Sequence, residues 1–105
     1  EGVVFSNWEY GKFNPNNLQV SYGQDYGFSI DPTTLVAVAI DKKKKLIYVK
    51  EHLYKPKLTT TQIASINAEV TKGKMIIGDS AEPRLIQELN NRQGCNVVPT
   101  NKGAG

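Results

Sequence analysis

Apolar residues in the first half of the chain follow the patterns of β-strands. Leu18–Phe28 carries apolar side chains at alternate positions and is interrupted by Gly23 and Gly27, which indicate a bulge or a close approach to the backbone. Thr34–Ile40 is an almost unbroken apolar run rich in β-branched residues, which is typical of a strand covered on both faces. Leu46–Leu53 alternates again. These runs predict three strands joined by a turn and a hairpin.

The second half of the chain combines helical periodicity with short apolar runs. A Thr-x-x-Gln capping box precedes the first helical pattern, and a glycine follows it. Ser80 is placed to cap the second pattern, which a glycine also ends. The signals predict four elements: a helix at 60–72, a strand at Met75–Gly78, a helix at 81–93 and a strand at Asn96–Pro99.

The order of the predicted elements indicates the fold class. Two hairpin links followed by two helical crossovers require a mixed sheet, antiparallel first and parallel later. We therefore predict an α/β fold with a ribonuclease H-like mixed five-stranded sheet flanked by helices. Residues 1–17 read as a linker or N-terminal arm with a short strand near Val3–Phe5, and residues 18–105 as the domain.

Composition narrows the classes of function. With 105 residues there is room for one small domain, and 39% hydrophobic with 22% charged residues is an ordinary folded balance. No apolar run approaches the ~20 residues of a membrane-spanning helix, and no G-x-x-x-x-G-K-S/T nucleotide motif occurs. One cysteine and one histidine cannot form a zinc cage, so a metal site must use carboxylates, which suit Mg2+ or Mn2+. The net charge of +3 is compatible with a polyanionic partner.

Two aspartates occupy positions that suggest chemistry. Asp25 lies within the first apolar strand, and Asp79 ends a buried strand directly before a helix. Ligands of open α/β sheets bind at the carboxyl ends of strands. If the two strands are adjacent and parallel, the carboxylates come together, and a divalent cation would offset their repulsion. We predict that Asp25 and Asp79 converge on one divalent ion.

Structural interpretations compete with this one. An aspartate at a strand end is often only a turn or cap residue, which fits Asp79 taken alone. Asp25 is harder to explain in this way, because burial of an unpaired carboxylate within an apolar strand is costly. Asp31 is expected to fix the turn before a proline. His52 and Cys95 are expected to be structural, since no partner for a cysteine nucleophile is in view.

Around these residues the chain resembles the C-terminal nuclease domain of the large subunit of tailed-phage terminases. The opening Gly2–Phe5 with Trp8 is similar to the segment that links the ATPase and nuclease parts of that family. Each motif is weak alone, but their order and spacing together are specific. The matching stretches are Gly23–Phe28, Asp31–Leu35, Ile77–Pro83 and Asn101–Gly103.

The resemblance implies a metal-dependent endonuclease that cleaves double-stranded concatemeric viral DNA. It implies that residues matching Asp25 and Asp79 hold Mg2+ or Mn2+, with two ions in the full domain. It further implies a portal protein and a small terminase subunit as partners of the parent protein, and a phage or prophage origin with action in the bacterial cytoplasm and away from the membrane. Lys102 and Arg84 are candidate DNA contacts, whereas Lys42–Lys45 is either a phosphate contact or a solvated turn.

The chain also departs from the family. Its third acidic ligand lies beyond the Lys102–Gly103 loop, and this chain stops at Gly105. Only Glu82 and Glu88 follow Asp79 as carboxylates, and Glu82 suits the exposed first turn of a helix. We therefore expect a truncated nuclease domain that binds Mn2+ weakly and is inactive or nearly so by itself.

Two other functions stay open at this point. The Asp25-Tyr26-Gly27 stretch also fits the phosphate-contacting D-x-G of an actin-like ATPase lobe, although 105 residues cannot hold the duplicated second lobe. The other alternative is a non-catalytic DNA- or protein-binding module of ribonuclease H-like fold. Stabilisation by Mn2+ rather than by Mg-ATP would distinguish the nuclease from the ATPase.

Overall fold

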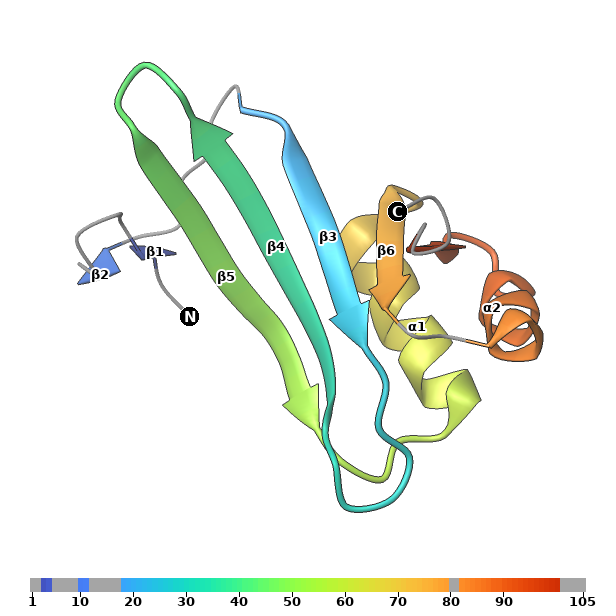
Figure 1. Ribbon diagram of the computed structural model, residues 1–105. Helices are drawn as coiled ribbons and strands as arrows, with labels where there is room; N and C mark the ends of the chain where they lie inside the picture. Colours follow the sequence, from blue (N-terminus) through green and yellow to red (C-terminus); the bar gives the residue numbers. More distant parts are fainter. Residues whose placement is uncertain (1–2, 5–9, 12–17, 80–81, 101–105) are drawn as a thin grey trace.

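The computed structural model describes residues 3–4, 10–11, 18–79 and 82–100, and its main feature is a mixed five-stranded sheet (Figure 1). A separate two-stranded pair is formed by β1 (Val3–Val4) and β2 (Tyr10–Gly11). The order of the main sheet is β5-β4-β3-β6-β7. Its strands are β3 (Val20–Asp25), β4 (Thr33–Asp41), β5 (Leu46–Lys55), β6 (Met75–Asp79) and β7 (Asn96–Pro99).

The pairing within this sheet follows the connections. β3, β4 and β5 are antiparallel neighbours, whereas β6 pairs parallel with β3 and with β7. A hairpin reverses the chain, while a helical crossover returns it to the same direction. The predicted ribonuclease H-like mixed sheet is therefore confirmed. The first strand is shorter than the predicted Leu18–Phe28 because the chain leaves the sheet after Asp25.

The first helix, α1 (Thr60–Thr71), begins and ends where its sequence signals stand. The Thr59 hydroxyl accepts from the Gln62 backbone N–H at 3.1 Å, and the Gln62 side chain accepts from the Thr59 N–H at 2.8 Å. This capping box satisfies two N–H groups that the helix itself cannot pair. The helix ends at Lys72, whose φ of 53° is left-handed.

The second helix, α2 (Pro83–Asn90), is shorter than the predicted 81–93. Pro83 occupies its first turn, where the missing N–H costs nothing, and Glu82 is the N-cap residue without a side-chain capping bond. The predicted cap, Ser80, lies outside the described residues. No helix in the described part of the chain is both long and apolar enough to cross a membrane.

Both helices cover one face of the sheet, where the core lies. α1 passes behind β3 and β6 in Figure 1, and α2 lies beside it. The core cluster contains residues from the strands and from both helices. Every second strand residue points to this face, because successive side chains of a strand point to opposite faces of the sheet. The cluster consists of Leu35, Leu58, Ile63, Ala64, Ile76, Leu89, Cys95 and Val97, all buried.

The opposite face carries apolar residues that no helix among the described residues covers. Val36 and Val38 are half-buried there, whereas Ile40 and its pairing partner Ile47 are 56% and 43% exposed. The prediction that the Thr34–Ile40 run is covered on both faces is therefore wrong for the described part of the chain. β-Branched residues favour an extended backbone whichever face of the sheet they lie on, whereas the helices pack on only one face. A run rich in such residues therefore does not show that both faces are covered.

A buried amide pair fixes α1 to β3. Gln24 Nε2 of β3 donates to the side-chain Oδ1 of Asn67 at 2.7 Å, and Asn67 Nδ2 donates back to Gln24 Oε1 at 2.8 Å. Gln24 is 3% exposed and Asn67 is fully buried. Asn67 also donates to Cys95 Sγ at 3.7 Å. Because each amide satisfies the other, neither leaves an unpaired polar group in the core.

Tyr26 packs against the core cluster, but its polar hydroxyl group is not satisfied there as the amide pair is. A Cβ at Gly78 would lie 2.9 Å from the Tyr26 hydroxyl, so the ring packs where β6 has no side chain. The hydroxyl is buried and has no hydrogen-bond partner among the described residues. Burial raises the pKa of Tyr26 well above its ordinary value, and the charges of Cys95 and Asp25 act in the same direction.

We expect removal of one member of the amide pair to destabilise the fold more than removal of both. Asn67→Leu leaves the Gln24 amide unsatisfied, which costs about 2 kcal/mol of unfolding free energy. Adding Gln24→Met, of similar shape, should recover at least half of that loss. Urea denaturation of the two single variants and the double variant completes the cycle. Additive losses would contradict a coupled pair.

We expect Tyr26→Phe to stabilise the protein, because it removes a buried and unpaired hydroxyl. The gain should be about 1 kcal/mol, or roughly 4–8 °C in Tm. Above pH ~10 the unfolded chain releases this tyrosine's proton before the folded one does, so wild-type stability falls with rising pH and the Phe variant lacks that share of the loss. Tyr54→Phe, at a 64% exposed tyrosine, is the control. A lower Tm for Tyr26→Phe would contradict the expectation.

Candidate functional site

Asp25 and Asp79 are the last residues of the neighbouring parallel strands β3 and β6. They are direct register partners, and the same pairing continues through Gln24 with Gly78 and Gly23 with Ile77. Parallel neighbours lie about 4.8 Å apart and partners point to the same face. Both aspartates therefore project from the face opposite the helices, at the carboxyl ends of the strands. The structure brings together the two residues that the sequence singled out.

The surroundings of Asp25 differ from the sequence-based expectation. Asp25 is exposed at the end of its strand rather than buried within an apolar one. The expectation that the Asp25 carboxylate is buried is therefore wrong. The reason is parity: Gln24 points into the core and Asp25, one residue later, points outward. The case for a site depends on the pairing with Asp79 instead.

Two threonines hold the backbone that carries Asp25. The Thr34 hydroxyl accepts from the Asp25 N–H at 3.2 Å. The fully buried Thr33 hydroxyl accepts from the Gly27 N–H at 3.0 Å and donates to the Gly27 carbonyl at 2.9 Å. A Cβ at Gly27 would collide with the Asp31 carbonyl, which confirms the predicted close approach at this glycine. The loop after Asp25 is thus closed by these threonines, which the sequence did not identify as site residues.

Asp79 is half-buried and is supported from β7. The Thr100 hydroxyl donates to Asp79 Oδ1 at 3.5 Å, and the Thr100 N–H donates to the Gly78 carbonyl at 3.2 Å. The residue after β7 therefore orients the carboxyl end of β6. No pattern in the sequence marks Thr100, because its contact with Asp79 depends on the pairing of β6 with β7.

A hollow of about 450 Å³ adjoins this end of the sheet. It is bounded by Tyr26 and Phe28, which follow Asp25, and by the first turns of α2. Arg84 and Glu82, both exposed, line it on the helix side. Phe28 is 50% exposed. The hollow therefore combines an exposed aromatic ring and an arginine on the helix side of the sheet, and neither aspartate lines it.

The other candidates from the sequence lie elsewhere. Cys95 is buried in the core, and burial raises the pKa of its thiol although the bond from Asn67 acts to lower it, so it is a packing residue as expected. His52 lies against Tyr22, with ring centroids 6.3 Å apart. The lysines Lys42–Lys45 occupy the opposite end of β4 from Asp25. Lys102 lies outside the described residues.

The donor set at the strand ends suits a hard cation. Two carboxylates project side by side with access to solvent, and oxygen ligands are what Mg2+ and Mn2+ prefer. Within the described residues, no group of three or more His, Cys, Asp or Glu side chains is placed to hold a metal ion. The carboxylates that the described residues bring together at this end of the sheet are the pair Asp25 and Asp79.

Comparison with known proteins relates this geometry to a family. The family described as "Terminase RNAseH like domain" matches residues 25–105. The PBSX phage terminase large subunit of Bacillus subtilis strain 168 is 33% identical over 84 residues, which cover 79% of this chain and 19% of that protein. The terminase large subunit of Bacillus phage SPP1 is 30% identical over 99 residues, which cover 93% of this chain and 22% of that protein.

Two solved structures have the same fold. The nuclease domain of the large terminase from bacteriophage SPP1, solved with bound Mn, matches with a TM-score of 0.69 and 29% identity over 87% of this chain and 50% of that one. The P22 large terminase nuclease domain matches with a TM-score of 0.62 at 15% identity over 83% and 48% of the two chains, which shows the fold alone.

The chain thus spans about a fifth of the length of these curated relatives and about half of the solved nuclease domains. The family match begins at Asp25 itself and includes Asp79. The chain belongs to the RNase H-like nuclease domain family of phage terminase large subunits.

Proposed function

We propose that this chain supplies Asp25 and Asp79 as ligands for Mg2+ or Mn2+ in an endonuclease that cleaves double-stranded concatemeric viral DNA. The observation that supports this most is the register pairing of Asp25 with Asp79 on one face of the sheet. The manganese in the related SPP1 nuclease domain supports the choice of metal. Family membership favours this function over the actin-like ATPase lobe and over a non-catalytic module.

The two aspartates differ in how they are held. Asp25 is exposed, and its backbone is fixed by Thr34, so its carboxylate is positioned without being enclosed. Asp79 accepts from Thr100 through Oδ1. Both carboxylates present negative charge at the same edge, and a divalent ion held there would activate water and stabilise the charge that develops on the phosphate.

Arg84 is proposed to bind the DNA backbone from the helix side of the sheet. Its guanidinium lines the hollow beside Tyr26 and Phe28, and a planar guanidinium matches the geometry of a phosphate. Lys102 is proposed as a second phosphate contact on the strength of its match to the family motif. In the full domain we propose two ions, which demand more carboxylates than this pair.

The related proteins suggest where the parent protein acts and which partners it has. Terminase large subunits of a Bacillus phage and of Bacillus subtilis support action in the cytoplasm of a bacterial host. We propose that the parent protein acts with a portal protein and a small terminase subunit. Residues 18–105 would then form part of its nuclease domain, with residues 1–17 as the linker.

We expect weak Mn2+ binding that depends on both aspartates. Two carboxylates leave most of the six positions of the ion to water, so affinity is modest. Asp25→Asn or Asp79→Asn removes one charge at nearly the same shape and should weaken binding by about tenfold, or ~1.4 kcal/mol. Titration of Mn2+ followed by the electron paramagnetic resonance of the free ion measures this directly.

The matched control for this titration is Asp31→Asn, which removes an exposed carboxylate in the loop after Asp25. It should bind Mn2+ like the unmodified chain. Equal weakening by Asp31→Asn would indicate a diffuse charge effect. Unchanged affinity in Asp25→Asn would remove Asp25 from the site.

We expect little cutting of supercoiled plasmid by this chain in Mn2+ and none by Asp25→Asn. Without a second ion the site lacks several kcal/mol of transition-state stabilisation, and each ~1.4 kcal/mol is a factor of ten in rate. A protein that spans the full length of the solved nuclease domains should nick the plasmid much faster. Rapid nicking by the short chain would show that two aspartates are sufficient.

A further inference from the structure

Lysines occupy two connections at the end of the main sheet that is remote from Asp25 and Asp79. The turn between β4 and β5 carries Lys42–Lys45, and the loop between α1 and β6 carries Lys72 and Lys74. All six side chains are exposed. In Figure 1 both connections lie toward the upper end of the strands, whereas the arrowheads of β3 and β6, where the aspartates lie, point downward. We call these six lysines the basic end.

The strands separate the basic end from the aspartates. The Asp25 N–H bonds to Thr34 near the start of β4, and β4 then runs to Asp41 before the lysines begin. At about 3.3 Å per residue this is roughly 23 Å. The lysines of the β4–β5 turn therefore lie too far away to contact the phosphate that the aspartates would act on. They can contact the same polyanion several base pairs away, since a duplex rises about 3.4 Å per base pair.

The β4–β5 turn is held in shape without a ligand. Asp41 Oδ1 accepts from the Lys44 backbone N–H at 3.1 Å, and Lys45 adopts a left-handed φ of 57°. The carboxylate nearest the four lysines in sequence is therefore engaged with the backbone of the turn. A turn that is already ordered loses little backbone entropy when it binds, so more of the electrostatic attraction appears as affinity.

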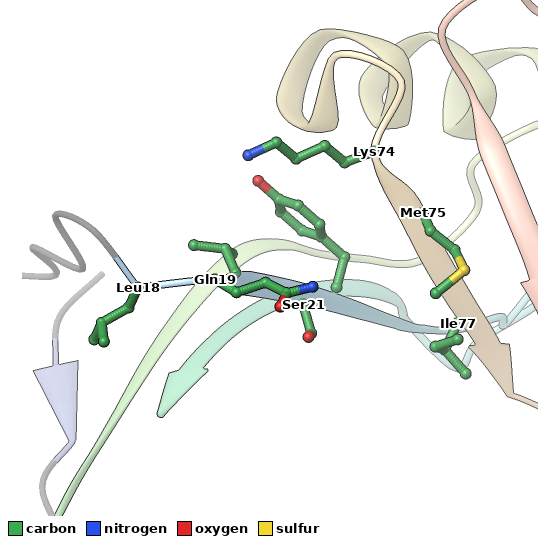
Figure 2. Close-up of a pocket in the computed structure, with 8 residues that line it drawn as sticks. Leu18, Gln19, Ser21, Lys74, Met75 and Ile77 are labelled. Atoms are coloured by element: carbon green, nitrogen blue, oxygen red, sulfur yellow. The ribbon is translucent and has the colours of Figure 1, made fainter. Parts of the chain in front are cut away.

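The second part of the basic end borders a hollow. About 330 Å³ lie between the starts of β3 and β6, bounded by Leu18, Gln19, Met75 and Lys74 among others. Figure 2 shows the Lys74 side chain extending over this hollow from the β6 side. The ammonium group is thus presented at the same end of the sheet as the β4–β5 turn, but from another strand.

We propose that the basic end binds the phosphate backbone of duplex DNA without reading its sequence, as an anchor separate from the metal site. This inference rests on the proposed function, which supplies DNA as the polyanion. Flexible lysines are point charges that suit phosphates and carry no base specificity. The anchor would raise the affinity for DNA and leave the ligands of the metal unchanged.

The test measures the binding of a fluorescent duplex in EDTA over a range of salt concentrations. Lys43→Gln with Lys44→Gln should weaken binding by roughly tenfold and lower the slope of log K against log salt by about 2, because each phosphate contact contributes ~0.9. The matched control is Lys55→Gln with Lys57→Gln, which removes two charges around the other end of β5. The control should keep the slope of the unmodified chain.

Two results would overturn the proposal. Equal losses in both double variants would mean that only net charge matters. Binding through these lysines to phosphatidylserine vesicles, with none to DNA, would mean that the basic end serves a membrane surface. Failure of the proposed function gives a different result, namely unchanged Mn2+ affinity in Asp25→Asn. The lysine variants are compared by their affinity for duplex DNA in EDTA, where no metal is bound.

Discussion

The parallel pairing of β3 with β6 is the constraint on which the rest of this structure depends. A parallel neighbour cannot be reached by a tight turn, so the chain must leave β5, form α1 and return. The register of that pairing sets Gln24 beside Gly78 and Asp25 beside Asp79. The amide of Gln24 then locks onto Asn67 of α1. One register therefore fixes the crossover helix on one face and joins two aspartates on the other.

Because successive strand residues point to opposite faces, residues of the core alternate along β3 with residues of the solvent-accessible face. Gln24 belongs to the core and Asp25 to the solvent-accessible face, one position apart. A slip of one residue would bury the carboxylate and expose the amide, so the buried amide pair also protects the placement of the aspartate. Tyr26 continues the alternation by packing over Gly78. The stability of the fold and the position of the site thus depend on the same few residues.

The two aspartates and the basic end lie at opposite ends of the strands. Carboxylates of Asp25 and Asp79 lie at one end of the sheet, and the lysines of two connections lie at the other. The end that carries the aspartates also carries exposed cationic side chains, namely Lys55, Lys57 and Arg84, so positive charge is present at both ends. Ile40 and Ile47, beside the β4–β5 turn, are exposed in the described part of the chain. The chain covers about half of the length of the solved nuclease domains.

The sequence by itself determined the elements, their order and the sheet they form, because hydrophobic period, capping and turn residues act locally. Thr59 and Gln62 define the start of α1, and the predicted Asn96–Pro99 is β7. It also singled out Asp25 and Asp79. Only the tertiary structure decided that Asp25 is exposed and that Thr33, Thr34 and Thr100 hold the site. Those facts depend on register between strands and on contacts across loops, and no local pattern encodes which residue of one strand faces which residue of another.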